Sequence, residues 1–549
     1  MRIWLTFTVL LTLGLIGLAP AHAENCPRPG VGAVVQPPPD VFSQSGKLSV
    51  TLYYESDVDS QGVTLYCFVT PSGQESPTLH VMPGDTVDIL LVNKVPEPAS
   101  GARVNKSQKM MEMTTSADAV CGAATMDTTS VNIHFHGMNV PPTCHADEVI
   151  HTLVNSGQSF RYVFKIPANE PPGMYWYHPH VHGQSEAAVL GGGAGAIEVE
   201  GIQNVQPAVN GLPARYLVLR DQLIPGPLLP SQPGWNVSVN YVPILYPDYK
   251  PAILEVNSGQ QEFWRVVNAS ADTIMDVALV YDKVPQTLQI AALDGVPTGS
   301  QNGTEQGTLI PVKHILIPPA GRAEFIATMP SASVKQALFV TRKINTGAVG
   351  DNDPARPLAR LLQATNTSLP VLQTLADFHK TIPRFNGLAN ATVTATRTLY
   401  FSETFVETHH APTVNRHLLP SDAVAFYITV KGQTPTVFNP NNPPAITTRQ
   451  GSVEDWTIYN QAPEVHEFHI HQIHFLLMDR DGQPVSRAER QMYDTVNVPA
   501  WSGKGPYPSV TVRLDFRGPV VGDFVYHCHI LGHEDAGMMA IIRVLPKAT

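Results

Sequence analysis

Three stretches of the chain share one pattern: "VMPGDTVDILLVN" at 81–93, "VNSGQQEFWRVVN" at 256–268 and "TRQGSVEDWTIYN" at 448–460. Each has a turn, then a run of residues typical of a β-strand, then a closing asparagine. Similarity that returns at the scale of a domain indicates a repeated architecture. The sequence therefore predicts an all-β protein built from three similar β-sandwiches in a row.

Length and composition agree with several β domains. The chain has 549 residues, whereas one hydrophobic core stops growing at roughly 250–300 residues. Charged residues make up only 15%, and there are 49 Pro and 40 Gly, which favours strands joined by tight turns over long charged helices. The net charge of −11, with no basic stripe, argues against a nucleic-acid partner.

Further strands are expected around the repeats wherever alternating segments lie between turn signals. The Pro- and Ala-rich passage 353–391 is expected to be a linker with a short helix. The predicted strands are 48–54, 86–92, 160–166 and 196–199, then 215–220, 252–256, 262–267, 314–317 and 324–327, and 397–401 at the start of the third set. We predict domains at 24–203, 204–375 and 376–549.

The N-terminus is typical of a signal peptide. Arg2 precedes an almost wholly apolar run at 3–18, and Ala21-His22-Ala23 forms a small-x-small cleavage site. The alternative is a membrane anchor, for which the apolar run is short. We predict removal of residues 1–23 and export to the periplasm or the medium, without a stable membrane anchor.

Cysteine usage agrees with an exported protein. Cys26, Cys67, Cys121 and Cys144 lie in the first third of the chain and can form two disulfides, with three possible connectivities. Cys528 is left over, and its histidine neighbours suggest a reason.

Four clusters concentrate the histidines of the chain. They are His134-Phe135-His136, His178-Pro179-His180, the segment from His466 to His471, and "HCHILGHEDAGMM" at 527–539. Residues i and i+2 of a strand share a face. The pairs that would do so are His134 with His136, His178 with His180, His469 with His471, and His527 with His529. If these strands converge, eight imidazoles can hold several metal ions.

Cys528 predicts a second, different metal centre. It stands between His527 and His529, so its side chain must leave their face. His466 likewise leaves the face of His469. Cys528 with His466 and His533, and with Met538 as a weak axial ligand, is the donor set of a blue-copper electron-transfer centre. Because Cys528 is bonded to residues of the other cluster, a covalent path joins the two sites.

A single His-x-His is often only a pair of ordinary surface or core histidines, and His-Cys-His alone could be a zinc fragment. Four pairs in this order, closed by Cys-x4-His-x4-Met, are far harder to obtain by accident. With these motifs the chain resembles the three-domain multicopper oxidases, the laccase-like family, over nearly its whole mature length. The resemblance implies three consecutive cupredoxin-like Greek-key β-sandwiches, with the copper cluster between the first and third and a supporting role for the second.

The resemblance also implies four coppers per chain and a ligand for each motif position. The type 1 copper would be held by His466, Cys528, His533 and Met538, and the type 2 copper by His134 and His469. The type 3 pair would be held by His136, His178, His180, His471, His527 and His529.

Carboxylic acids are expected near the cluster because oxygen reduction consumes protons. Glu534 resembles the acid found there in bacterial members. The family often has an Asp eleven residues after the first histidine. His145 occupies that position here, and Asp147 is the predicted substitute. Two further departures are Glu467, where Pro is usual, and Gln472, where Gly is common.

The leading functional hypothesis is an oxidase of phenols and aromatic amines, which would dock near His466 and reduce O2 to water. The second hypothesis is a metallo-oxidase of cuprous, ferrous or manganous ions. It would use carboxylate or Met ligands such as Glu467 or the insert with Met110, Met111 and Met113. A non-catalytic copper-binding protein is disfavoured because every expected ligand is present. A copper nitrite reductase is disfavoured because its chemistry does not need four paired-His strands.

Overall fold

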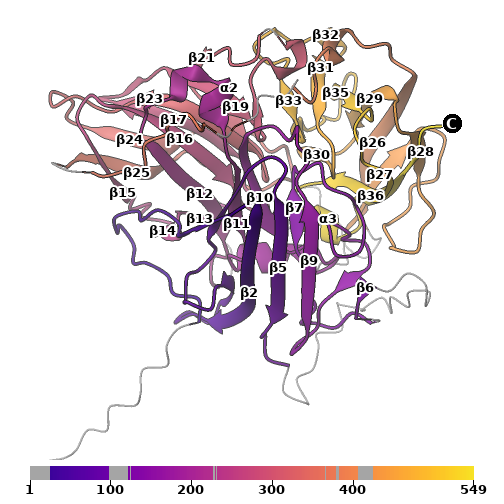
Figure 1. Cartoon of the computed structure of the whole chain (residues 1–549), viewed down its shortest axis with the longest axis horizontal. Coiled ribbons are helices and arrows are strands. Elements are labelled where there is room, and N and C mark those ends of the chain that lie inside the picture. Colours follow the sequence, from indigo (N-terminus) through magenta and orange to yellow (C-terminus); the bar gives the residue numbers. More distant parts are fainter. Residues whose placement is uncertain are drawn as a thin grey trace, which may run out of the picture.

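The computed structural model describes residues 25–97, 121–123, 125–226, 229, 232–303, 305–364, 367–376, 378, 383–405 and 424–548. Its strands fall into three β-sandwiches that follow one another along the sequence (Figure 1). The all-β prediction with three consecutive sandwiches is therefore confirmed. The predicted signal peptide and the Met110–Met113 insert lie outside the described residues.

The first sandwich packs two sheets over a core that includes Leu52, Ile89 and Tyr162. One sheet has the order β3-β2-β5-β9 and the other β1-β4-β11-β10-β7. The strands are β1 (Asp40–Phe42), β2 (Lys47–Val58), β3 (Thr64–Val69), β4 (Thr78–Val81), β5 (Thr86–Asn93), β7 (His134–His136), β9 (Ser159–Lys165), β10 (Gly173–His178) and β11 (Gly195–Val199), with the short pair β6 (Cys121–Gly122) and β8 (Thr152–Leu153) beside them.

The second sandwich has a core of its own, which includes Trp264, Leu279 and Phe325. One sheet comprises β12 (Ala214–Gln222), β13 (Asn236–Val239), β14 (Val242–Ile244), β16 (Gln261–Asn268), β19 (Leu288–Leu293), β20 (Val296–Pro297), β21 (Ile310–Val312) and β23 (Arg322–Thr328). The other comprises β15 (Ala252–Val256), β17 (Met275–Tyr281), β18 (Val284–Pro285), β22 (Ile315–Ile317), β24 (Ala337–Thr341) and β25 (Arg356–Gln363).

The third sandwich surrounds a core that contains Trp456, Phe468 and Cys528. One sheet comprises β26 (Ala395–Phe405), β27 (Val424–Val430), β29 (Val453–Asn460), β31 (Phe475–Arg480), β32 (Gln483–Pro484), β33 (Met492–Tyr493) and β35 (Ser509–Asp515). The other comprises β28 (Ile446–Arg449), β30 (His466–Ile470), β34 (Thr495–Val498), β36 (Gly522–Cys528) and β37 (Met539–Leu545).

The three repeated stretches occupy equivalent places in their sandwiches. Each repeated strand pairs on one side with a parallel strand and on the other with an antiparallel one. These neighbours are β2 and β9 for β5, β12 and β23 for β16, and β26 and β35 for β29. The sequence repeat is therefore a repeat of topology.

The closing asparagine makes the same hydrogen bonds in each copy. The side-chain oxygens of Asn93, Asn268 and Asn460 each accept the backbone N–H of the residue two positions later. Each side-chain amide donates to two or more backbone carbonyls of neighbouring segments. Buried backbone groups need such partners where a strand ends, which explains why this residue type returns at this position.

The prediction of a linker at 353–391 is partly wrong. Residues 356–363 form β25, which pairs with β15 and β24 inside the second sandwich. The prolines at 354 and 357 suggested a loop, but Pro357 is placed in a strand whose side chains are largely buried. The short helix of this passage is η3 (Leu388–Asn390), a single 3-10 turn.

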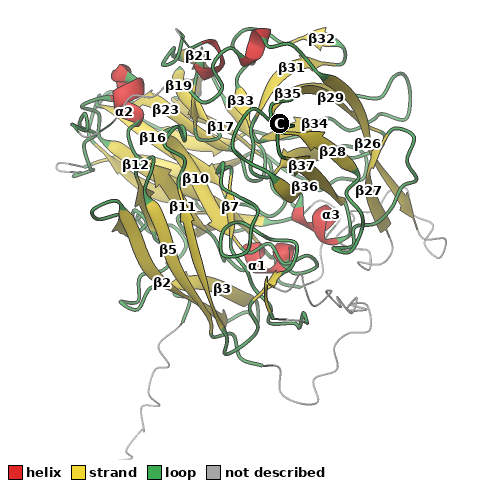
Figure 2. Ribbon diagram, turned by 45° about the vertical axis from the view of Figure 1, so that its right-hand side comes forward, coloured by secondary structure: helices red, strands yellow, loops and turns green. Residues whose placement is uncertain are grey.

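Helices are few in the described residues: α1 (Ser185–Leu190), α2 (Ile202–Val205), α3 (Leu531–Asp535) and the 3-10 turns η1 (Pro207–Val209), η2 (Ser300–Asn302) and η3. Within the described ranges, no helix has both the length and the apolar character needed to cross a membrane. Helix α1 of the first sandwich lies against α3 of the third (Figure 2). This contact helps to bring the first and last parts of the chain together.

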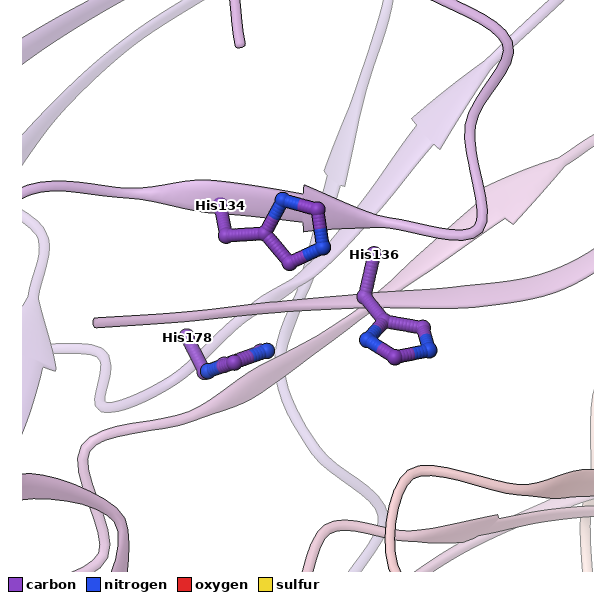
Figure 3. Close-up of side chains that lie close together, drawn as sticks. All are labelled: His134, His136 and His178. Carbon is purple, nitrogen blue, oxygen red and sulfur yellow. The ribbon is translucent and has the colours of Figure 1, made fainter. Parts of the chain in front are cut away.

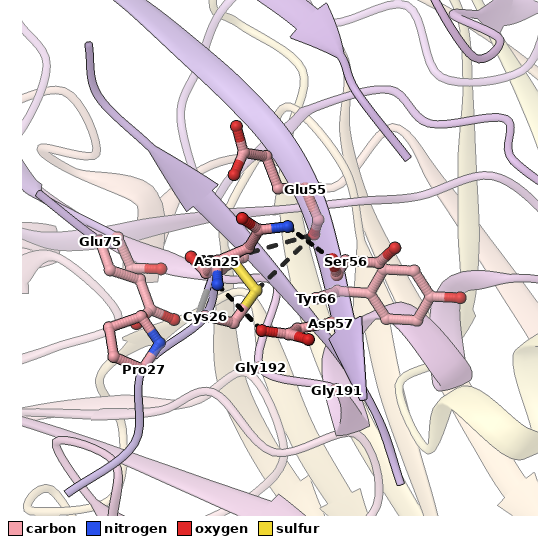
Figure 4. The surroundings of a disulfide bond; sticks show 12 residues. Asn25, Cys26, Pro27, Glu55, Ser56, Asp57, Tyr66, Glu75, Gly191 and Gly192 are labelled. Carbon is pink, nitrogen blue, oxygen red and sulfur yellow. Dashed lines mark hydrogen bonds between the residues drawn. A yellow bond between two sulfur atoms is a disulfide. The ribbon is translucent and has the colours of Figure 1, made fainter. Parts of the chain in front are cut away.

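Two disulfides settle the connectivity that the sequence left open. Cys26 bonds Cys67, and Cys121 bonds Cys144. The first bond ties the segment at Asn25 to β2 and β3, where Asn25 donates to Asp57 and to the backbone of Ser56 (Figure 4). Within the described chain Cys528 is the free cysteine, and it is buried.

Replacing Cys26 and Cys67 together by serine is expected to lower the free energy of unfolding by about 4 kcal/mol, because this bond closes a long loop of the unfolded chain. The sequence separation is 41 residues. Urea unfolding of the double variant, compared with the protein unfolded without reductant, measures the change. With reductant in both samples, the double variant and the wild type should unfold alike, and a large difference would contradict the explanation.

Candidate metal centres

Strand pairing brings the histidine pairs together within each sandwich. In the first sandwich β10 pairs with β7 so that His178 stands opposite His134 (Figure 3). In the third, β30 pairs with β36 so that His469 stands opposite His527. The side chains therefore gather because of the register of the strands, as face alternation predicts.

The two groups of histidines then meet across the boundary between the first and third sandwiches. The ring of His134 stacks on His471 with centroids 3.8 Å apart, and the ring of His136 stacks on His469 at 4.1 Å. All eight side chains are buried, with at most 1% exposed. The eight are His134, His136, His178, His180, His469, His471, His527 and His529.

Hydrogen bonds fix one nitrogen of several rings and leave the other facing the cluster. The Nδ1 atoms of His178 and His527 lie 2.9 and 2.8 Å from backbone carbonyl oxygens, to which they donate. Nδ1 of His469 does the same to the carbonyl of Asp494 at 2.8 Å. Within the described structure, Nε2 of His178 and of His469 has no hydrogen-bond partner although it is buried. Nε2 of His527 faces Nε2 of His180 at 3.3 Å and Nε2 of His471 at 3.1 Å.

Burial keeps these imidazoles neutral. It lowers the pKa of His527 to about 3 and that of His180 to about 4. The pKa values of the other six lie well below the usual value for the same reason. Neutral imidazoles whose lone pairs converge without protons between them are metal ligands. The donor set thus fits a group of metal ions.

A second, smaller centre contains Cys528, His466 and His533. The Nδ1 atoms of the two histidines lie 3.0 Å apart, and each is within 3.7 Å of the Cys528 sulfur. Burial raises the pKa of the Cys528 thiol, so a nearby cation is needed to hold the thiolate. One thiolate with two imidazoles fits copper. Met538 is also buried in this core, and its carbonyl accepts the N–H of Cys528.

His533 is the less deeply buried histidine of this centre. Its residue is 9% exposed, whereas His466 is 0% exposed. Nε2 of His533 lies 3.2 Å from a carboxylate oxygen of Glu464, and its ring stacks on Phe426. Docking of a substrate near His466 stays a prediction, and the smaller burial of His533, whose Nδ1 lies 3.0 Å from that of His466, favours approach from the His533 side of the centre.

Asp147 lies directly behind the first histidine. Both of its carboxylate oxygens are 3.0 Å from Nδ1 of His134, and one accepts the N–H of Phe135. The Gln472 side-chain amide also donates to Asp147. Gln472 has φ = +57°, a conformation that favours glycine. His145, at the family's usual position, instead binds the carbonyl of Arg161.

The two glutamates singled out in the sequence are both fully buried. Glu534 lies 3.6 Å from Nδ1 of His182, and burial raises the pKa of its carboxyl. Glu467 accepts a hydrogen bond from Asn497, and burial raises its pKa to about 8. Glu467 is 0% exposed, which disfavours it as a ligand for a substrate metal ion arriving from solvent.

Sequence reasoning missed Asp494 and Arg322. A carboxylate oxygen of Asp494 lies 3.1 Å from Nε2 of His136, and Arg322 donates to both oxygens of this carboxylate. The Thr-Val strand that follows Asp494 gave no signal of this contact. Arg322 lies 172 positions away in the second sandwich, so no local pattern could have revealed it.

Comparison with known proteins agrees with this geometry. Two family models described as "Multicopper oxidase" match residues 123–204 and 412–548. "Multicopper oxidase mco" of Staphylococcus aureus is 31% identical over 121 residues, 21% of this chain and 24% of that protein. "Laccase" of Bacillus subtilis (strain 168) is 31% identical over 110 residues, 18% of this chain and 21% of that protein. The matched region spans about a quarter of the length of these curated relatives.

Solved structures share the fold over nearly the whole chain. A multicopper oxidase from Campylobacter jejuni, described as a metallo-oxidase, has a TM-score of 0.65 and 20% identity, and the match covers 95% of this chain and 96% of that one. A laccase-like CueO from Ochrobactrum sp. has a TM-score of 0.64 and 18% identity, with 93% and 100% covered. Both family models coincide with the parts of the chain that carry the histidine motifs, and these parts, residues 123–204 and 412–548, belong to the multicopper oxidase family.

Proposed function

We propose that the protein is a laccase-like oxidase that takes single electrons from phenols or aromatic amines and reduces O2 to water in a four-electron reaction. The observation that carries this proposal is the position of Cys528. Its sulfur belongs to the smaller centre, while the neighbouring His527 and His529 belong to the eight-histidine cluster. One segment of backbone therefore joins a site suited to accepting electrons to a site large enough for several metal ions.

Four coppers are proposed. His466, Cys528, His533 and Met538 would hold the type 1 copper, and His134 and His469 the type 2 copper. His136, His178, His180, His471, His527 and His529 would hold the type 3 pair. Bound copper would supply one-electron transfer at the first centre and reduction of O2 at the cluster.

The remaining groups position ligands or move protons. Asp147 holds the His134 ring from behind, a role that second-shell carboxylates commonly play for metal-binding histidines. Glu534 is the proposed proton donor, because it is completely buried directly after His533 and burial raises the pKa of its carboxyl.

The reducing substrate is proposed to approach His533. The carboxylate of Glu464 lies against Nε2 of that ring and is 3% exposed, and it is the proposed partner for a phenolic O–H or a metal ion that reaches this ring. Because of this carboxylate the metallo-oxidase alternative is retained, with Glu464 in place of Glu467 as the candidate ligand for a metal ion. Export as a cleaved precursor is also part of the proposal, supported by the two disulfides, which persist in oxidising compartments.

Steady-state oxygen consumption by the copper-loaded protein tests the proposal. We expect fast turnover with dimethoxyphenol and little with cuprous or ferrous ions. The reverse would favour a metal-detoxifying oxidase, and no turnover with any of them would leave a copper-binding protein. Glu464→Gln and Glu467→Gln form a matched pair of buried carboxyl variants. If metal ions were substrates, only Glu464→Gln would raise their KM.

A further inference from the structure

We propose that Arg322, from the second sandwich, is a positioning residue for the histidine cluster and acts through Asp494 of the third. Arg322 lies at the start of β23. Its Nη1 donates to Oδ1 of Asp494 at 2.9 Å, and its Nη2 donates to Oδ2. Both side chains are completely buried. The proposal rests on the copper cluster of the proposed function and gives the middle domain a part in it.

Asp494 transmits the position of Arg322 to His136. Oδ1 of Asp494 lies 3.1 Å from Nε2 of His136. An ionised carboxylate only accepts hydrogen bonds, so Nε2 must carry the proton and Nδ1 the lone pair. Nδ1 of His136 is buried and, among the described atoms, has no hydrogen-bond partner. Arg322 therefore helps to select the tautomer in which Nδ1 of His136 can bind a metal ion.

The same aspartate orients a second histidine. Its backbone carbonyl accepts from Nδ1 of His469, whose ring is stacked on His136. His136 comes from the first sandwich and His469 from the third, so the Asp494 residue fixes one ring on each side of the boundary. A shift of Asp494 would move both rings.

Arg322 is itself held from all three sandwiches. Its backbone N–H donates to Oδ1 of Asp294, whose Oδ2 accepts the backbone N–H of Asp494. Its Nε donates to the carbonyl of Met174 in the first sandwich. The guanidinium is thus fixed before any metal ion arrives, and its rigid fork matches the carboxylate in a way that a lysine cannot.

Gly137, which closes the first His-x-His motif, makes room for this pair. A Cβ at this position would lie 2.5 Å from Nη2 of Arg322 and 2.5 Å from Oδ2 of Asp494. The residue also has φ = +84°, which favours glycine. The sequence His-x-His-Gly therefore encodes both a ligand pair and the space for the groups that orient it.

Removal of Arg322 would leave Asp494 buried without its cation. Both carboxylate oxygens of Asp494 would lose their guanidinium donors, so the side chain that faces Nε2 of His136 would no longer be held in place. Loss of such a partner behind a metal-binding histidine typically weakens metal binding by about 10–100-fold.

The test compares Arg322→Met with Arg265→Met. Arg265 is a matched control because it is also a completely buried arginine of the second sandwich, and it pairs with Glu198 and Glu324. Within the described structure its hydrogen-bond partners are Glu198, Glu324 and Tyr216, none of them a histidine of the cluster. For copper-loaded wild type and both variants, one measures copper per chain, the electron paramagnetic resonance of the cluster, the blue absorption of the Cys528 centre, and copper loss to a chelator.

We expect Arg322→Met to lose cluster copper to the chelator at about 10–100-fold lower chelator concentration than wild type, with its blue absorption retained. Arg265→Met should keep wild-type copper binding even if it is less stable, and Arg322→Lys should fall between wild type and Arg322→Met. Equal copper retention in Arg322→Met and wild type, or equal loss in the Met variants of Arg322 and Arg265, would overturn the proposal.

If Arg322→Met does not fold, Asp494→Asn provides the same test, because the amide has the shape of the carboxylate but sets an N–H against either Arg322 or His136. Selective loss of cluster copper supports the positioning role, and unchanged copper binding overturns it. Wild-type protein that binds no copper at the cluster would instead contradict the proposed function, so the two failures can be distinguished.

Discussion

Cys528→Ser is expected to abolish the intense blue absorption and nearly all oxidase activity, while the fold and the cluster remain. Serine has the size of cysteine but lacks the thiolate that makes this centre a blue-copper site. The sulfur is completely buried in the core of the third sandwich, so this small replacement leaves the packing almost unchanged. Visible absorption, copper content and oxygen consumption of the purified variant measure the three effects.

Met538→Leu is the control for this prediction. The thiolate stays, so the blue absorption should persist, while loss of the axial thioether changes the reduction potential. An intense blue band in Cys528→Ser would contradict the assignment of this centre. Loss of secondary structure in Cys528→Ser, seen by circular dichroism, would mean that the cysteine has a structural role instead.

Glu534→Gln is expected to slow reoxidation by O2 by roughly 10²-fold, with little change in the reduction of the Cys528 centre by substrate. General acid groups typically contribute 10²–10⁴-fold to the step in which they transfer a proton. Glu534 is buried, and burial raises its carboxyl pKa, so this group can hold a proton for delivery. Glutamine keeps the shape but cannot give up a proton. Stopped-flow mixing of reduced enzyme with O2, and of oxidised enzyme with substrate without O2, separates the two steps.

The neighbouring Asp535 provides a matched control. Its carboxylate accepts the backbone N–H groups of Gly183 and Glu186 at the start of α1, so Asp535→Asn should lower stability without slowing reoxidation selectively. If Glu534→Gln and wild type reoxidise at the same rate, the relay proposal fails. If both variants slow equally, the effect belongs to the α1–α3 contact and not to proton transfer.

The repeated strands and the histidine pairs could be predicted from the sequence because both depend on local periodicity. Face alternation alone places His527 and Cys528 on opposite sides of one strand, and the described geometry agrees. The strand at 356–363 was missed because its prolines imitate a loop. The contact of Arg322 with Asp494, and of Asp494 with His136, joins all three sandwiches. It was missed because it depends on how separate sandwiches pack. The copper type of each ligand stays a prediction, since it rests on the family pattern.

Exposure was the other quantity that local patterns could not supply. His466 and His533 are equivalent as donors in the sequence, yet their burial differs, since His533 on α3 is 9% exposed and His466 on β30 is 0% exposed. The disulfide pairing was open for a similar reason, since spacing alone leaves three connectivities. In both cases the missing information is the packing of distant segments.

The asparagine that closes each repeated strand separates two kinds of constraint. Asn268 keeps its full set of hydrogen bonds in a sandwich whose described residues carry no histidine pair, so the framework persists without the ligands. The strand framework of the second sandwich is therefore independent of the copper ligands. New His-x-His pairs on strands of the middle domain are expected to be compatible with the hydrogen bonds of Asn268, without rebuilding of the strand ends.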